Sequence, residues 1–530
     1  MPQPLGYLSI VLHAHLPYVR HPEKAKCLEE LWLMEAITET YIPLIWVLEG
    51  LLHDGVDFRL AMSITPTLAS MLADDFLQRR YIKHINDLQE LAAKEVKRTR
   101  HQPRLQTVAL MYLEHFQAAQ NLFEKYHGRL LDAFRHIART GKLEILASAA
   151  THGYLPLLSI NPKAVEAQIA VGVATYKRDF GRDPEGFWLP ECGFVPGIEQ
   201  ILARYGIRYF LTDSHGLIHG EPKPLSSVYA PIYTPAKVAA FGRDWESSKQ
   251  VWSATEGYPG DYYYRDFYRD IGFDLDYDYI RPYLVEGIRG FTGIKYHRIT
   301  GPTGHKEIYD PDIARERAAE HGGNFMFNRE LQIRHLASQM TRPPLVVAPY
   351  DAELFGHWWH EGPKWLDYLF RKTAYDQNVF AMITPGEYLK RYPQGQIGIP
   401  SESSWGSGGY HEVWLDRSNT WIYRHLHKAA DRMGDMASKH RHATGTLRRA
   451  LNQAARELLL AQASDWAFIM KTDTMVEYAI SRTKTHLVNF IALHEEVSKQ
   501  QINEAKLQEL ESHNNIFPEL DFAIYAHGAG

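Results

Sequence analysis

Short apolar segments rich in strand-favouring residues recur through the first part of the chain, and each ends in polar residues, Pro or Gly. They predict strands over residues 7–13, 58–64, 143–149, 186–190, 207–212, 345–350 and 379–384. Between some of these segments the apolar positions recur with helical spacing. One helix is predicted from Asn161 to Phe180, with Asn161 as N-cap and Pro162 in the first turn, and another from Ile198 to Tyr205. Strands that alternate with helices predict parallel βαβ units.

The residues that follow the predicted strands are polar or carry reactive side chains. His13 and His15 end the first strand, Thr151 and His152 follow the third, and Glu191 and Asp351 follow two others. This pattern is typical of an α/β barrel whose site lies at the carboxyl ends of its strands. We therefore expect a barrel of about seven strands. A doubly wound open sheet would show the same alternation and is the alternative fold.

Two long segments interrupt the alternation, and a third follows it. Residues 74–140 have helical periodicity without a strand, which predicts an inserted helical subdomain. Residues 220–330 are rich in Pro, Gly and Tyr and are expected to form a long, ordered loop insert. Amphipathic helices dominate after about residue 405. We therefore assign residues 1–400 to a catalytic barrel with both inserts and residues 401–530 to a C-terminal helical domain.

Composition excludes several classes of protein. The chain of 530 residues is 45% hydrophobic and 23% charged, as in ordinary globular proteins, and its net charge of −5 argues against binding nucleic acid. The N-terminus does not resemble a signal peptide, and the apolar run 41–52 is too short to span a bilayer. Cys27 and Cys192 cannot build a disulfide framework. We expect a cytoplasmic monomer with no nucleic-acid or membrane partner.

Aromatic residues make up 12% of the chain, including 12 Trp and 31 Tyr. Most rings fill cores, but sugars also lie on rings through their C–H faces. Glu191 and Asp351 each end an aromatic strand, and their convergence on one face would provide the paired carboxylates of glycosidic-bond chemistry. The neighbours Trp188, Phe194 and Trp358 would raise a carboxyl pKa by desolvation. A helix cap or a loop salt bridge is the structural alternative for either acid.

His13 and His15 are two residues apart, so both would lie on one face of a strand. They could bind a divalent metal together with Asp213 or Asp351. They could also bond to sugar hydroxyls, or be structural histidines satisfied by the protein. The sequence does not choose among these interpretations.

Five segments in order resemble the motifs of glycoside hydrolase family 57. These are HAHLP (13–17), ASAATHGYLP (147–156), WLPECGF (188–194), APYDAELFGHWW (348–359) and MITPGEYL (382–389). HAHLP, ECGF and the segment QASDWAF (462–468) are most similar to the 1,4-α-glucan branching enzymes of that family. The likeness covers nearly the whole chain. One departure is Trp466-Ala467-Phe468, where the family usually has Trp-Pro-Phe.

The resemblance implies a (β/α)7 barrel with an inserted helical subdomain and a C-terminal helical domain. It implies Glu191 as nucleophile and Asp351 as general acid/base, with retention of configuration and no metal or cofactor. His13, His15 and His152 would line the donor-sugar subsite. Asp465 and Trp466 would approach the cleft from the C-terminal domain.

Branching further requires that water be excluded and that a second glucan strand be bound. By the resemblance, Tyr233 lies at the tip of a loop that covers the site, and we expect it to shield the intermediate. Trp32, Trp358, Trp405 and Trp414 are expected to bind glucan.

Three alternatives stay open. An α-amylase or 4-α-glucanotransferase of the same family would use the same carboxylates. A metal-dependent carbohydrate deacetylase would use the histidines as ligands. A catalytically silent glucan-binding protein would use only the rings.

Overall fold

The computed structural model describes residues 3–253 and 256–527, and its centre is a ring of seven parallel strands. The ring runs in the order β8 (Leu345–Asp351), β1 (Gly6–Ala14), β2 (Leu60–Ile64), β3 (Leu143–Ser148), β4 (Gly186–Trp188), β5 (Tyr209–Thr212) and β7 (Ala239–Gly242). The amide of Asp244, just after β7, donates to the carbonyl of Val347 on β8 at 2.8 Å. This bond joins the two ends of the sheet, so the predicted (β/α)7 barrel is confirmed.

All seven predicted strand segments form strands, but one of them is not part of the ring. Residues 379–384 contain β9 (Phe380–Met382), which pairs with Gly6–Leu8 of β1. Because β8 occupies the other edge of β1, β9 lies on the same edge as β2, which pairs farther along at Val11–Ala14. The seventh member of the ring is β7, and it lies in the segment that was predicted to be a long loop.

Residues 256–310 form only short elements, as in a loop, but the prediction of a loop over the whole of 220–330 is wrong. This segment contains β6 (Ile232–Tyr233), antiparallel to β7, and helices α11 (Trp245–Trp252), α12 (Ile271–Asp274) and α13 (Tyr277–Ile280), and it enters α14 (Pro311–Gln339). Strand β7 reads AAFG and has one large apolar side chain. Such a short segment of small residues lacks the periodic signal by which strands are recognised.

Helices α1 (Glu30–Ala36) and α2 (Ile42–His53) are joined by a π-helical turn, Ile37–Tyr41. Together they make a helix, Glu30–His53, that is long and apolar enough to cross a membrane. Its most apolar window is 72% buried inside the protein, as in a core helix. The apolar run 41–52 is the middle of this helix, which packs against α6 and α15.

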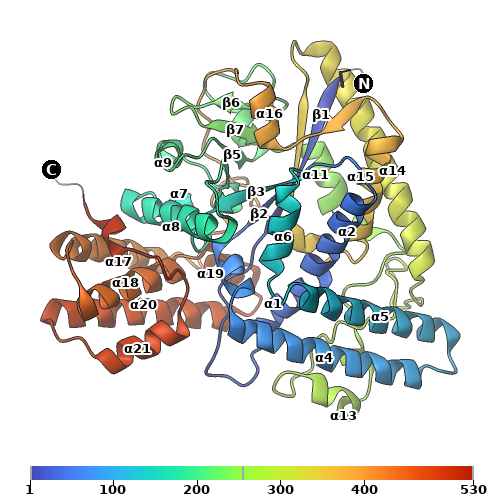
Figure 1. The fold of residues 1–530 in the computed structure, drawn as a ribbon, viewed down its shortest axis with the longest axis horizontal. Coiled ribbons are helices and arrows are strands. Elements are labelled where there is room, and N and C mark those ends of the chain that lie inside the picture. The colour runs from blue at the N-terminus through green and yellow to red at the C-terminus, as the bar shows by residue number, and fades with distance from the viewer. Residues whose placement is uncertain (1–2, 254–255, 528–530) are drawn as a thin grey trace.

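The predicted helical insert forms three helices, α4 (Asp75–Arg98), α5 (Pro103–Lys125) and α6 (Leu130–Arg139). Helices α4 and α5 lie side by side along one end of the molecule (Figure 1). Asp74 caps α4 by accepting a hydrogen bond from the amide of Leu77.

The remaining helices of the barrel region are α3 (Pro66–Leu72), α7 (Leu155–Leu158), α8 (Pro162–Phe180), α9 (Ile198–Arg204), α10 (Ser214–Ile218), α15 (Gly362–Tyr375) and α16 (Pro385–Arg391). The predicted cap of α8 is confirmed, since the Asn161 side chain accepts from the amides of Lys163 and Ala164.

The C-terminal region is helical, as predicted. Helices α17 (Trp421–Lys439), α18 (Gly445–Ala461), α20 (Val476–Lys499) and α21 (Glu504–His513) form a group at one side of the barrel, while α19 (Ser464–Thr472) lies between that group and the strands (Figure 1). Ala463, at the start of α19, makes a backbone bridge to Gly153 after β3. The start of α19 is thereby fixed against the carboxyl end of the barrel.

Candidate active site

The carboxyl ends of the barrel strands open into a cleft of about 920 Å³. Ten residues singled out from the sequence line it together: His13, His15, Trp32, His152, Glu191, Asp351, Trp358, Trp405, Trp414 and Asp465. Tyr7 and Val11 of β1 are buried in the barrel interior. Because side chains alternate along a strand, His13 points to the same interior face, at its open end.

Glu191 lies in a single 3-10 turn, Pro190–Cys192, that directly follows β4. Its backbone is left-handed, with φ 59° and ψ 23°, and the next residue, Cys192, has φ 50°. Residues other than Gly seldom adopt this backbone conformation. Where they do, the surrounding structure holds them in it, often at a functional site. Here Trp405 supplies the restraint, since its backbone amide donates to the Glu191 carbonyl at 3.0 Å.

Both oxygens of the Glu191 carboxylate accept hydrogen bonds from residues far along the chain. Trp405 Nε1 donates to Oε2 at 2.9 Å, and Ser464 Oγ donates to Oε1 at 3.1 Å. Burial raises the pKa of Glu191, whereas the bond from Trp405 acts to lower it. The two donors therefore orient the carboxylate and favour its charged form.

Asp351 is the last residue of β8 and lies opposite His13 in register. Burial raises the pKa of Asp351 well above its usual range, and the nearby carboxylates of Glu353 and Glu191 raise it further. A carboxyl group whose pKa is raised in this way keeps its proton more readily and can donate it, while the two donors stabilise Glu191 as a charged acceptor. The two environments suit the two roles of glycosidic-bond chemistry, with Asp351 as the acid and Glu191 as the nucleophile.

Glu353 lies two residues beyond Asp351 and also lines the cleft. Its Oε1 accepts hydrogen bonds from the Tyr41 hydroxyl at 2.5 Å and from the backbone amide of His15 at 3.2 Å. Burial raises its pKa, and the bond from Tyr41 opposes that shift. Sequence reasoning did not assign it, although it stands beside Asp351 in the same motif.

The three histidines form one stacked group. The rings of His15 and His152 are 3.9 Å apart, and His13 Nε2 is 3.0 Å from His152 Nε2. The Nδ1 atoms of His13, His15 and His152 are hydrogen-bonded to Ser63, Thr65 and Ser464 respectively. Each ring is thereby fixed in orientation by a hydroxyl group behind it.

Charge differs among these rings. Burial holds the pKa of His13 and of His152 well below the usual value, and the charge on His15 adds to this effect. Burial alone would also lower the pKa of His15, but the Asp465 carboxylate, 3.0 Å from Nε2, reverses the direction and raises it. The surroundings therefore favour the neutral imidazole at His13 and His152 and the charged, ion-paired form at His15.

Several side chains in and near the cleft are of the types that bind a divalent metal ion. His15, His152 and Asp465 have ligand atoms within 4.8 Å of one another. Their ring nitrogens and carboxylate are already hydrogen-bonded within the protein. Asp213, the other ligand considered, instead pairs with His215 at 3.1 Å and Arg243 at 3.3 Å. The histidines thus form a hydrogen-bonded wall, and Asp213 does not complete a ligand set with His13 and His15.

Aromatic side chains form much of the cleft wall. Trp405 packs edge-on against Trp188 and Trp252 at centroid distances of 5.0 and 6.1 Å. Trp414 lies almost wholly buried and stacks on Tyr154 at 4.3 Å. Trp358, by contrast, is 54% exposed within the cleft. Trp252 and Phe468 also line this cleft, and no sequence pattern marks them, because each lies in a helical segment with no strand-end signal.

Two expected site residues lie elsewhere. Tyr233 belongs to β6 and pairs with Ala239, the first residue of β7, so it lies at the end of that strand away from the cleft. Gly395 packs against its ring. Trp466 is fully buried, and its indole N–H donates to the Leu460 carbonyl at 2.8 Å. Neither residue is among the described residues that line the cleft.

Comparison with known proteins identifies the family of this chain. The sequence profile "Glycosyl hydrolase family 57" matches residues 9–400 of the chain. The chain belongs to glycosyl hydrolase family 57. A second profile, "1,4-alpha-glucan branching enzyme, C-terminal", matches residues 425–525 of this family 57 protein.

Three relatives resemble this family 57 member over most of its length. A 1,4-alpha-glucan branching enzyme of Thermococcus kodakarensis is 35% identical over 97% of this chain and 77% of its own. The crystal structure of a GH57-type branching enzyme from Pyrococcus horikoshii is 34% identical, with a TM-score of 0.89, and covers 99% of this chain and 97% of that one. The crystal structure of a novel alpha-amylase from Thermotoga maritima is 46% identical, with a TM-score of 0.93, and covers 99% of this chain and 100% of that one.

Proposed function

We propose that the protein is a 1,4-α-glucan branching enzyme, which cleaves an α-1,4 linkage and transfers the released segment to a 6-hydroxyl with retention of configuration. One observation carries the proposal. The C-terminal helical region matches the branching-enzyme profile, and the start of its α19 supplies Ser464 and Asp465 to the catalytic cleft. The region is therefore part of the site rather than an appendage.

The reaction follows from the two carboxyl groups. Glu191 attacks the anomeric carbon while Asp351, protonated in its buried setting, gives its proton to the leaving oxygen. A glycosyl ester forms on Glu191. Asp351, now charged, then takes the proton of the acceptor 6-hydroxyl as that oxygen attacks the anomeric carbon, releases the Glu191 carboxylate and restores the α configuration. The neutral imidazoles of His13 and His152 can exchange hydrogen bonds with sugar hydroxyls throughout.

Hydrolysis by an α-amylase activity is the second candidate, and two observations favour it. The 46% identical structure is described as an alpha-amylase. Tyr233 lies away from the cleft, so the shielding of the ester that was expected of it has to come from other residues. Trp252 and Trp405 meet edge-on in the cleft wall and are the rings placed to limit access of water.

The test is to incubate purified protein with amylose in the presence of EDTA, beside Glu191→Gln and Asp351→Asn. Reducing ends are counted before and after enzymatic debranching of the product. New α-1,6 linkages in the wild type, with rates at least about a thousandfold lower in both variants, are expected for branching by this carboxylate pair.

The other outcomes discriminate among the candidates. New reducing ends without branches would assign the protein to hydrolysis. If EDTA abolishes activity and a divalent cation restores it, the reaction depends on a metal ion. His15, His152 and Asp465 would then bind that ion, as in a metal-dependent deacetylase. Full activity of Glu191→Gln would contradict both glycosidic proposals.

The setting in which the enzyme works is also a proposal. We infer a monomer in the cytoplasm that acts on an amylose-, glycogen- or starch-like glucan. Cys27 and Cys192 are both free and buried, which fits a reducing compartment. Light scattering at several concentrations and fractionation of cells test the oligomeric state and the location.

A further inference from the structure

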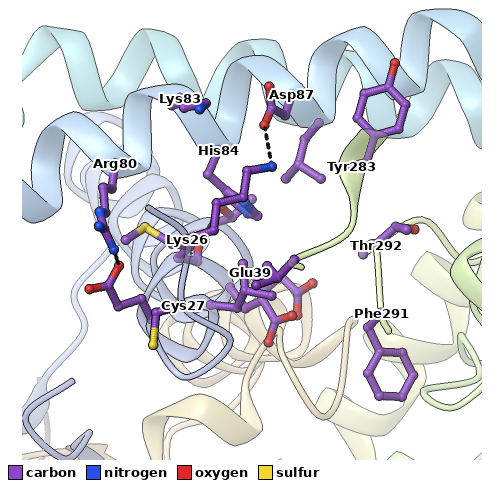
Figure 2. A pocket seen from close by; sticks show the side chains of 18 of the residues that line it. Lys26, Cys27, Glu39, Arg80, Lys83, His84, Asp87, Tyr283, Phe291 and Thr292 are labelled. Carbon is purple, nitrogen blue, oxygen red and sulfur yellow. Dashed lines mark hydrogen bonds and ion pairs between the residues drawn. The ribbon is translucent and has the colours of Figure 1, made fainter. Parts of the chain in front are cut away.

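A second cavity lies beside the catalytic cleft, bounded by helix α1, helix α4 of the insert and the segment 283–293 (Figure 2). Its volume is about 100 Å³. It is much smaller than the catalytic cleft of about 920 Å³, so it suits a single sugar unit rather than a chain. Apolar side chains form much of its wall: Leu31, Met34, Leu88, Phe116, Val285 and Phe291.

The polar groups of this cavity favour an uncharged ligand. Lys26, Arg80 and Lys83 face four acids, and two ion pairs, Lys26–Asp87 at 3.8 Å and Arg80–Glu30, neutralise much of the charge within the set (Figure 2). A site for an anion or a cation would show an excess of the opposite charge. Burial lowers the pKa of His84 to about 4, so this ring is neutral as well.

Glu35 on α1 lines both the second cavity and the catalytic cleft. Glu39, one turn later, accepts a hydrogen bond from His357 Nδ1 at 2.6 Å, but none of the described residues donates one to Glu35. Burial raises the pKa of Glu35 to about 7, with the Glu39 charge contributing and His357 opposing. A largely buried carboxyl group without a donor is costly. A sugar hydroxyl can satisfy it in either protonation state, because a hydroxyl both donates and accepts.

Three rings connect the cleft to the second cavity. Trp358, exposed in the cleft, stacks on Phe267 at 4.5 Å, and Phe267 is 5.6 Å from Phe291. Phe291 is 39% exposed and lines the second cavity. We call these three rings the aromatic ridge. Sugars pack their C–H faces on such rings, so a glucan that leaves the cleft over Trp358 meets a path of ring contacts, bordered by the Lys295 ammonium over Phe267 and Phe291 at 4.6 and 4.2 Å.

We propose that the aromatic ridge and the second cavity form a remote subsite for the far end of an α-1,4-glucan bound in the cleft. Glu35 forms a hydrogen bond with a hydroxyl of the glucan, and the cavity binds the terminal glucosyl unit of that chain. The proposal rests on the proposed action on α-glucan. The Lys26–Asp87 pair across the cavity is about one-third exposed, and such surface pairs contribute roughly 0–1 kcal/mol, so a ligand can displace it at little cost.

The experiment measures binding of linear maltooligosaccharides of increasing length to Glu191→Gln protein, which holds substrate without turnover. Phe291→Ala shortens the ridge, and Leu88→Trp fills the cavity from α4. Phe327→Ala on α14 is the matched control, because Phe327 is exposed and lies outside both cavities. We expect unchanged binding of maltotriose and about five- to tenfold weaker binding of the longest chains in both variants, and no change in the control.

Equal weakening for all lengths, or wild-type affinity for long chains in Phe291→Ala, would overturn the remote subsite. Because Phe291 is partly exposed, this variant tests the proposal even where Leu88→Trp fails to fold. The product assay on active protein is separate. Absence of new branches would contradict the proposed branching activity, whereas only the dependence of binding on chain length bears on the subsite.

Discussion

At the scale of single residues, the acid and the nucleophile are separated by their environments. Asp351 is buried beside two other carboxylates, and Glu191 is held by two hydrogen-bond donors. Activity therefore requires Asp351 protonated and Glu191 charged. Activity should fall at low pH as Glu191 takes up a proton and at high pH as Asp351 loses one, which gives a bell-shaped profile.

Replacing Glu353 by Gln should move only the alkaline limb of that profile. After burial, the Glu353 charge is the strongest influence raising the Asp351 pKa. Its removal lowers that pKa, so the loss of kcat/KM with rising pH should begin at a lower pH than in the wild type. The amide oxygen of Gln can still accept from Tyr41. The profile is measured with a soluble maltooligosaccharide, beside Glu495→Gln on the surface of α20 as control. An alkaline limb identical to that of the wild type would contradict the assigned coupling.

How far these residues could be predicted depends on where they lie. Glu191, Asp351 and the histidines end strands, and the carboxyl ends of parallel strands meet, so sequence order alone brings them together. Ser464, Trp252 and Glu35 lie on helices whose orientation depends on tertiary packing, and no local pattern marks them. Tyr233 was misplaced for the same reason, because its position depends on the antiparallel pairing of β6 with β7.

At the scale of elements, the barrel depends on close contact between helices and strands. A Cβ atom on Gly172 of α8 would lie 2.0 Å from the carbonyl oxygen of Ser148 at the end of β3. Gly172→Ala must push α8 away from the sheet, next to the strand that leads to His152. We expect it to lower the free energy of unfolding by about 3 kcal/mol.

Gly50 provides the matched comparison. It also lies inside a helix, α2, but nothing lies within 4 Å of its Cβ position. Gly50→Ala should therefore stabilise the protein by about 0.5–1 kcal/mol through helix propensity. Scanning calorimetry at one heating rate compares both variants with the wild type. Equal effects of the two substitutions would contradict the assigned contact between α8 and β3.

The helices and strands themselves could be predicted where the hydrophobic positions recur with a regular period. The cap at Asn161 and the helices of the insert follow from local chemistry. The place of β7 in the ring and the pairing of β9 outside it do not, because they are decided by how β2, β8 and β9 share the edges of β1 and by how the sheet closes through Asp244 and Val347. These are contacts between distant segments, and no stretch of sequence encodes them alone.

At the scale of the whole molecule, the site is shared between the barrel and the C-terminal helices. Ser464 Oγ donates to the nucleophile and is 2.9 Å from His152 Nδ1, and Asp465 pairs with His15. Removing the hydroxyl in Ser464→Ala leaves Glu191 with one donor. Because this bond helps to lower the Glu191 pKa, its loss should raise that pKa and move the acidic limb of the pH profile to higher pH.

The size of the effect follows from the strength of a hydrogen bond to a charged group. Such bonds contribute about 1.5–3 kcal/mol, so kcat should fall roughly tenfold or more. Ser464→Thr keeps the hydroxyl and should recover much of the rate and the original acidic limb. Ser512→Ala, an exposed serine in the same helical region, should change neither. A fall in kcat without movement of the acidic limb would mean that Ser464 acts only by holding α19 in place, and the C-terminal helices would then be a support rather than a part of the catalytic apparatus.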